Sequence, residues 1–100
     1  MSGESGGSVS TGGHVTVRYW AAARAAAGVE SDEVELTGTG TLADVLDAVR
    51  AAHADRPRVA EVVGICSVLV GDRPVGTAPP EEVRLVAGDV VELLPPFAGG

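Results

Sequence analysis

The spacing of the apolar residues changes along the chain, and this change limits the folds available to it. Near the N-terminus, Val15, Val17 and Tyr19 alternate with polar residues, a period of two that is typical of a strand with one buried face. In the middle of the chain the apolar spacing becomes that of a helix. Near the C-terminus, the run 90–94 is rich in valine and leucine, as expected of a further strand. A chain that begins and ends on strands and carries a helix between them is expected to pack a sheet on that helix.

The most clearly marked element is the helix that follows Thr41. Its apolar residues fall at i, i+3, i+4 and i+7, so they form one stripe: Leu42, Val45, Leu46 and Val49. Thr41 is a favourable N-cap, and Asp44 three residues later gives a pattern close to a capping box. We therefore expect this helix to begin after Thr41 and to end near His53.

Shorter elements are predicted on both sides of this helix. The alanine-rich segment 21–27 predicts a short helix, which Gly28 would end. The remaining expectations are strands at 33–37 and 66–70, a break at 38–40, a connection at 57–64 with room for a second short helical turn, a turn at 71–74, and brief extended pieces at 75–76 and 83–85.

Together these elements predict an α+β domain, a mixed sheet packed on one main helix. Because the first and last strands come from opposite ends of the chain and are separated by a helical crossover, a parallel central pair is expected. Residues 1–13 are rich in glycine and serine and are predicted to be a disordered tail. The folded domain is then expected at 14–96, followed by a flexible tail at 97–100.

Composition argues against several classes of function. The formal net charge is −7, so phosphates would repel the chain and nucleic acid is not an expected partner. The apolar runs are short and no basic and apolar leader opens the chain, which predicts a cytoplasmic protein without a membrane partner. A single cysteine and two distant histidines predict neither a disulfide nor a metal site. With no triad, acid/base pair or cofactor loop, a free-standing catalyst is not expected.

The C-terminal segment is the part of the chain that folding does not explain. Pro95 and Pro96 cannot donate to a ladder, and a proline pair favours an extended stem of about 3.1 Å per residue. Phe97 follows, and Gly99 and Gly100 end the chain. Glycine lacks Cβ, so its backbone can enter a slot too narrow for other residues. Apart from a simple frayed terminus, the pattern indicates that the prolines and Phe97 bind a partner protein, while the glycines carry the terminal carboxylate into its active site.

Four segments of the sequence are together similar to a known family. They are VTVRYWAAARAAAG at 15–28, TLADVL at 41–46, VGDRPV at 70–75 and AGDVVELLPPFAGG at 87–100. On these segments the chain resembles the MoaD/ThiS family of ubiquitin-like sulfur carriers, and within it the small subunit of molybdopterin synthase. The resemblance covers residues 14–100 in order and implies a β-grasp fold.

The resemblance also implies a chemistry for the terminus. An adenylating enzyme would use ATP to activate the carboxylate of Gly100, and sulfur would then displace AMP to leave a thiocarboxylate. A larger molybdopterin synthase subunit would receive the tail, with this chain as its sulfur donor and with no cofactor bound to the chain itself. Three alternatives stay open: a carrier for thiazole (thiamine) or another thio-metabolite, a ubiquitin-like protein modifier, and a module that only binds partners.

Four side chains each have two interpretations. Of Tyr19 and Trp20 at the end of the first strand, one is expected in the core and the other exposed, and an exposed Trp20 would belong to a partner surface. Phe97 is expected to anchor in a partner's pocket, and the alternative is packing on the domain's own edge. Cys66 opens an apolar strand with no histidine beside it, so we expect a core residue and not a nucleophile.

Overall fold

The computed structural model describes residues 12–37 and 39–96, which form seven strands, three α-helices and one short 3-10 helix. The helices are α1 (Ala21–Ala27), α2 (Leu42–Ala52), α3 (Pro57–Ile65) and η1 (Pro80–Glu82), and the strands are β2 (Gly12–Tyr19), β3 (Ser31–Thr37), β4 (Thr39–Thr41), β5 (Ser67–Val70), β6 (Arg73–Pro74), β7 (Arg84–Val86) and β8 (Val90–Leu94). Within these described ranges, no helix is both long and apolar enough to cross a membrane.

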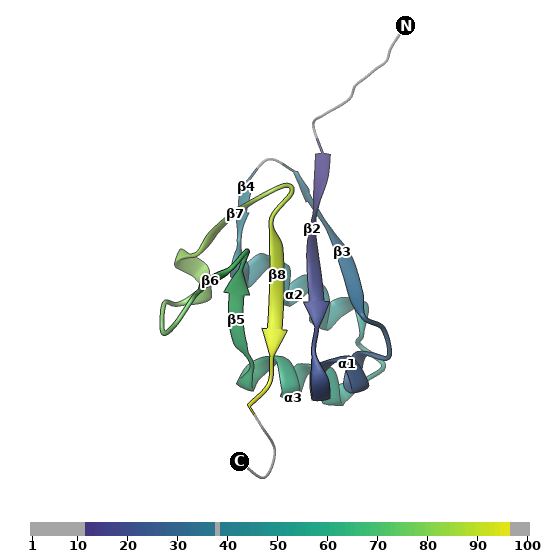
Figure 1. Cartoon of the computed structure of the whole chain (residues 1–100). Coiled ribbons are helices and arrows are strands. Elements are labelled where there is room, and N and C mark those ends of the chain that lie inside the picture. The colour runs from purple at the N-terminus through teal and green to yellow at the C-terminus, as the bar shows by residue number, and fades with distance from the viewer. Residues whose placement is uncertain (1–11, 38, 97–100) are drawn as a thin grey trace, which may run out of the picture.

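A five-stranded mixed sheet with the order β3-β2-β8-β5-β6 forms one layer, and the α-helices form the other (Figure 1). Strands β2 and β8 are neighbours and run parallel, with partners from Thr16↔Val90 to Tyr19↔Leu93. The flanking pairs β2–β3 and β5–β8 are antiparallel. A small second sheet pairs β4 with β7. The predicted α+β class and the predicted parallel central pair are therefore confirmed.

Two predicted helix signals are confirmed in detail. The Thr41 Oγ1 accepts a hydrogen bond from the Asp44 backbone N–H at 3.2 Å, and the Asp44 Oδ2 accepts one from the Thr41 N–H at 3.0 Å, which completes the capping box of α2. Gly28 ends α1 in the left-handed region with φ 78°, and its N–H donates to the Arg24 carbonyl at 2.9 Å. These are local signals, so the sequence alone could specify them.

The helix α3 corrects the prediction of a connection over 57–64. Pro57 occupies the first turn, where its fixed φ suits a helix and its missing N–H removes no intrahelical bond. Val59, Val62 and Val63 then form a buried stripe. Valine has a modest helix propensity, so packing of this stripe against the rest of the core decides the structure.

The boundaries of several strands also differ from the predicted ones. β2 begins at Gly12, before His14, because Gly12 and Gly13 pair with Thr37 and Leu36 through backbone groups that need no side chain. The expected break at 38–40 contains β4, which pairs with β7, and β6 lies at 73–74 where 75–76 was expected. The rest of the predicted N-terminal tail, residues 1–11, lies outside the described residues.

The core lies between the sheet and α2. Alternate residues of the two central strands, Val15, Val17, Tyr19, Val91 and Leu93, are buried and face the apolar stripe of α2. The other members of the buried cluster are Ala23, Ala27, Leu36, Leu42, Val45, Leu46, Val49, Val59, Val62, Val63 and Leu85. The opposite face of the sheet has no helix over it in Figure 1. The alternate residues of β2 and β8 that do not face the core point toward this uncovered face.

One polar network crosses from the sheet to the end of α2. The Tyr19 hydroxyl donates to the Asp32 Oδ2 at 2.7 Å, and the His53 Nε2 lies 2.6 Å from the same oxygen. The Tyr19 and His53 rings meet edge to face with centroids 6.0 Å apart. Burial, followed by the hydrogen bond and the charge of Asp32, raises the pKa of Tyr19 well above its usual value of 10.

We predict that Tyr19 ionises only at strongly alkaline pH. It is the only tyrosine, so absorbance near 295 nm reports it alone. Because the pKa is raised in the folded state, the stability that neutral Tyr19 contributes is intact below pH 10, the usual value, and is lost as pH rises above it. Asp32→Asn should lower the Tyr19 pKa and leave it above 10, since burial is the largest cause, whereas the exposed Asp47→Asn should not change it. An ordinary tyrosine titration in the folded wild type would contradict the prediction.

Candidate functional site at the end of β8

The last strand fixes the point from which the C-terminal segment leaves the domain. Val91 and Leu93 are fully buried, and Leu94 pairs with Ser67 of β5. Pro95 is half-buried and Pro96 is exposed. The predicted site residues Phe97, Gly99 and Gly100 lie outside the described residues. The structure therefore defines the base of the tail and the surface around it.

Trp20 lies beside this base, at the junction of β2 and α1. Its side chain is 39% exposed, while Tyr19 is 3% exposed, so the prediction of one core and one exposed aromatic is confirmed. The Trp20 backbone N–H donates to the Leu93 carbonyl at 3.2 Å, and its Nε1 donates to the Glu92 Oε1 at 2.9 Å. The Arg18 Cζ lies 5.0 Å from the ring centroid, within cation–π range. The partner-binding role of Trp20 stays a prediction. Its position beside the end of β8 is held by its two hydrogen bonds to that strand and by the contact of its ring with Arg18.

The backbone is strained directly after Trp20. Ala21 has φ 48°, in the left-handed region, and it is the only described residue other than glycine with a positive φ. This conformation costs an L-residue roughly 1–2 kcal/mol, and strain of this kind is often found at functional positions. Here it turns the chain sharply from β2 into α1 and keeps Trp20 at the surface.

Two apolar residues that the sequence analysis did not single out lie near the tail base. Ile65 ends α3 and is 62% exposed, and Leu94 is half-buried on the face of the sheet that has no helix over it. Trp20, Ile65 and Leu94 each lie near the end of β8 in the fold, and we call these three residues the tail-exit patch. The sequence could have indicated that both side chains point away from the core. Ile65 does not continue the helical stripe of Val59, Val62 and Val63, and Leu94 follows Leu93 in a strand and so lies on the opposite face.

Cys66 lies close to this patch but is poorly suited to carry sulfur. It follows α3 as its C-cap, is half-buried against the core and forms no disulfide. Burial raises the pKa of its thiol to about 11, so the thiolate is scarce at neutral pH. Among residues 12–37 and 39–96, no group of three or more His, Cys, Asp or Glu side chains is placed to hold a metal ion.

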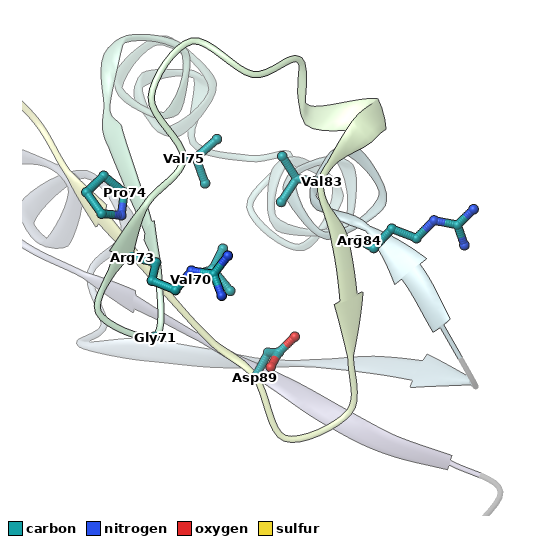
Figure 2. A pocket seen from close by; sticks show the side chains of 8 residues that line it. All are labelled: Val70, Gly71, Arg73, Pro74, Val75, Val83, Arg84 and Asp89. Atoms are coloured by element: carbon teal, nitrogen blue, oxygen red, sulfur yellow. The ribbon is translucent and has the colours of Figure 1, made fainter.

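A hollow of about 510 Å³ lies at the opposite end of β8, between the β5–β6 hairpin and β7. In Figure 2, Arg73 and Asp89 face it from the β6 and β8 sides, while the guanidinium of Arg84 extends away. Asp89 is engaged locally, since its Oδ2 accepts a hydrogen bond from the Val86 N–H at 2.9 Å. The five residues of β8 separate this hollow from Pro95 by roughly 15 Å, so it is not part of the tail site.

We predict that Cys66 reacts slowly with Ellman's reagent in the folded protein at neutral pH and rapidly in denaturant. The reason is that folding both buries the thiol and keeps it protonated. Because it is the only cysteine, the release of thionitrobenzoate reports it alone. A folded-state rate equal to that of the unfolded chain would show an accessible thiolate and reopen its role as a nucleophile.

Several solved structures share the fold of this chain. The most similar solved structures include SAMP1 from Haloferax volcanii, at 28% identity with a TM-score of 0.71, covering 88% of this chain and 100% of that chain. A putative molybdopterin converting factor subunit 1 from Pyrococcus furiosus follows at 26% identity and a TM-score of 0.67, covering 85% and 99%. The complex of subunits 1 and 2 of molybdopterin-converting factor from Helicobacter pylori 26695 matches at 24% identity and a TM-score of 0.54, covering 87% and 99%, and supports the fold alone.

No curated protein matches the chain. The sequence does match the ThiS family over residues 17–100, a span that takes in the tail-exit patch and the terminal glycines. These neighbours also confirm the predicted ubiquitin-like β-grasp fold. Since the match covers most of the chain, the protein belongs to the ThiS family and is a sulfur carrier or ubiquitin-like modifier of that type.

Proposed function

We propose that the chain is the sulfur-carrying small subunit of a molybdopterin synthase and that the carboxylate of Gly100 is its reacting group. The observation that carries the proposal is the family match, which extends to the last residue. The likeness to a putative molybdopterin converting factor subunit 1 supports the choice of pathway. Gly99 and Gly100 form the reactive tip, and Pro95, Pro96 and Phe97 form the stem that a partner holds.

The chemistry begins with activation, because a carboxylate is a poor electrophile. In an adenylating enzyme, a carboxylate oxygen of Gly100 attacks the α-phosphorus of ATP, and pyrophosphate leaves. Sulfide then attacks the acyl carbon, and the C–O bond to AMP breaks as the C–S bond forms, which leaves a thiocarboxylate. The carrier contributes a thin and accessible terminus, while the enzyme contributes positioning and charge stabilisation.

Delivery of the sulfur needs a second partner that receives the same tail. The residues after Leu94 span at most about 20 Å, so the body of the carrier must dock close to the partner's pocket. The tail-exit patch is the apolar surface around the tail base and suits that contact. We propose a larger synthase subunit as this partner, since the Pyrococcus furiosus neighbour is described as subunit 1 of a putative molybdopterin converting factor. The net charge of −7 favours a pocket mouth lined with arginine or lysine.

A ubiquitin-like modifier is the second candidate, favoured by the likeness to SAMP1. Both functions share the adenylated glycine and differ in the nucleophile, which is sulfur for a carrier and an amine of a target protein for a modifier. All seven basic residues of this chain are arginine, so no lysine is available on which copies of the chain could be linked to one another.

We predict that Gly100 becomes a thiocarboxylate in the native host. Intact-mass analysis followed by fragmentation should show exchange of one oxygen for sulfur at the last residue. If the terminus is unmodified under all sulfur supplies and is found in isopeptide bonds to target lysines, the modifier function replaces the carrier function.

The matched variants are deletion of Gly100 and addition of one residue after it. Both should abolish sulfur loading, because the carboxylate is misplaced relative to the adenylating site. Both should change the free energy of unfolding by no more than about 0.5 kcal/mol, since Leu93 is the last buried core residue among those that the structure describes. A large loss of stability would make the tail a structural element.

We predict that Phe97→Ala weakens binding to the larger subunit by on the order of 1–3 kcal/mol, as expected of a buried anchor. Trp20→Ala should weaken it too, whereas Val86→Ala, an exposed apolar residue on β7, should not. Affinity should fall with ionic strength because of the charged pocket mouth. Calorimetric titration at low and high salt measures both effects, and equal affinities for wild type and Phe97→Ala would remove Phe97 from the interface.

A further inference from the structure

A second hollow, of about 420 Å³, lies between α1 and the start of α3. Its lining consists of Ala22, Ala25 and Ala26 of α1, with Arg56, Pro57 and Arg58. The alanines and the proline make an apolar floor, and both charged residues of the lining are cations. In a chain with a net charge of −7, this is a local reversal of charge beside an apolar surface.

The cations here are not neutralised by neighbouring side chains. Over the described ranges 12–37 and 39–96, the ion pairs involve Arg24, Arg50 and His53, and neither Arg56 nor Arg58 takes part in one. Arg56 makes one long contact, from Nη1 to the Ala26 carbonyl at 3.5 Å. In the same part of the structure, the N-terminus of α3 has no side-chain cap and no acidic residue in its first turn. A carboxylate at this end of α3 would meet two guanidinium groups and the positive end of the helix dipole.

The C-terminal segment leaves the domain within reach of this hollow. Leu94 pairs with Ser67, two residues after α3 ends, and Leu93 accepts the N–H of Trp20, directly before α1 begins. Each helix therefore has one end next to the tail base (Figure 1). The nine residues of α3 are about 13 Å long, and the six residues after Leu94 span up to about 20 Å. The terminus can reach Arg58 without any change in the fold.

We propose that this hollow is a docking site for the chain's own residues 97–100. The segment carries one large apolar group, the ring of Phe97, and one charge, the carboxylate of Gly100. The hollow offers the complementary pair, an alanine floor for the ring and Arg56 and Arg58 for the carboxylate. In this state Phe97 packs on its own domain, and the reactive terminus is held against α3.

A weak contact suffices because the site and the segment belong to one chain. A short tether gives an effective concentration in the millimolar range, so an intrinsic dissociation constant of about 1 mM keeps the segment docked about half of the time. A partner that binds the free tail must then compete with the hollow for it. The apparent affinity of the partner equals its affinity for the free tail multiplied by the fraction of tails that are not docked. The inference concerns the carrier without partners and does not depend on which acceptor receives its sulfur.

The test is NMR of the full-length, uniformly labelled chain without any enzyme. Phe97 is the only phenylalanine, so its ring protons are unambiguous. We expect cross-relaxation between these protons and the methyl groups of Ala22, Ala25 and Ala26, with intensities that do not change on tenfold dilution. Absence of these signals would overturn the proposal, and signals that weaken on dilution would place the tail on a second copy and overturn it as well.

Arg58→Gln and Arg73→Gln form the matched pair of variants. Both residues are exposed and neither forms an ion pair among the described residues, but Arg73 lines the hollow at the far end of β8. Arg58→Gln and high ionic strength should each weaken the Phe97–alanine signals, and Arg73→Gln should leave them unchanged. Equal signals in the two variants would show that the carboxylate does not pair with Arg58. Failure here leaves sulfur loading intact, whereas failure of the proposed function leaves these signals intact, so the two are distinguishable.

Discussion

The parallel pairing of β2 with β8 is the contact on which the rest of the structure depends. It joins the first and last of the described strands in the middle of one sheet, with Val17 beside Val91 and Tyr19 beside Leu93. All four side chains are buried, so the pairing and the core stabilise each other. Because a parallel pair needs a long crossover, the intervening chain has room for α2 and for the other strands.

This pairing also determines where the C-terminal segment leaves the domain. β8 runs in the same direction as β2, so its C-terminal end meets the junction of β2 and α1, where Trp20 bonds to Leu93 and Glu92. A tail leaving an edge strand would have one neighbour, whereas this one leaves between two strands and beside two helix ends. The strained Ala21 belongs to the same junction, which supports a role in presenting Trp20.

The sequence predicted the elements whose causes are local. The capping box at Thr41 and Asp44, the stripe of α2 and the glycine end of α1 each depend on residues within about two turns of one another. What it missed depends on contacts distant in the sequence. α3 is valine-rich and has no side-chain cap, and Asp32 finds its partners Tyr19 and His53 across 13 and 21 positions. At the site, Trp20 was found as an exposed aromatic, but its bond to Glu92 spans 72 positions and left no local signal.

The proposed exchange of residues 97–100 between binding sites requires that the domain fold without them. Among the described residues Leu93 is the last that is fully buried, and the two prolines that follow cannot extend the ladder, so the proposal gives residues 97–100 no part in folding. A segment that is not needed for folding can exchange between binding sites at little cost. If it is docked on α1 and α3 half of the time, a partner loses only a factor of two in affinity, about 0.4 kcal/mol, whereas one buried aromatic anchor is worth more than that. On this proposal, a weak self-contact covers the carboxylate between partners and still yields to an enzyme that binds the tail.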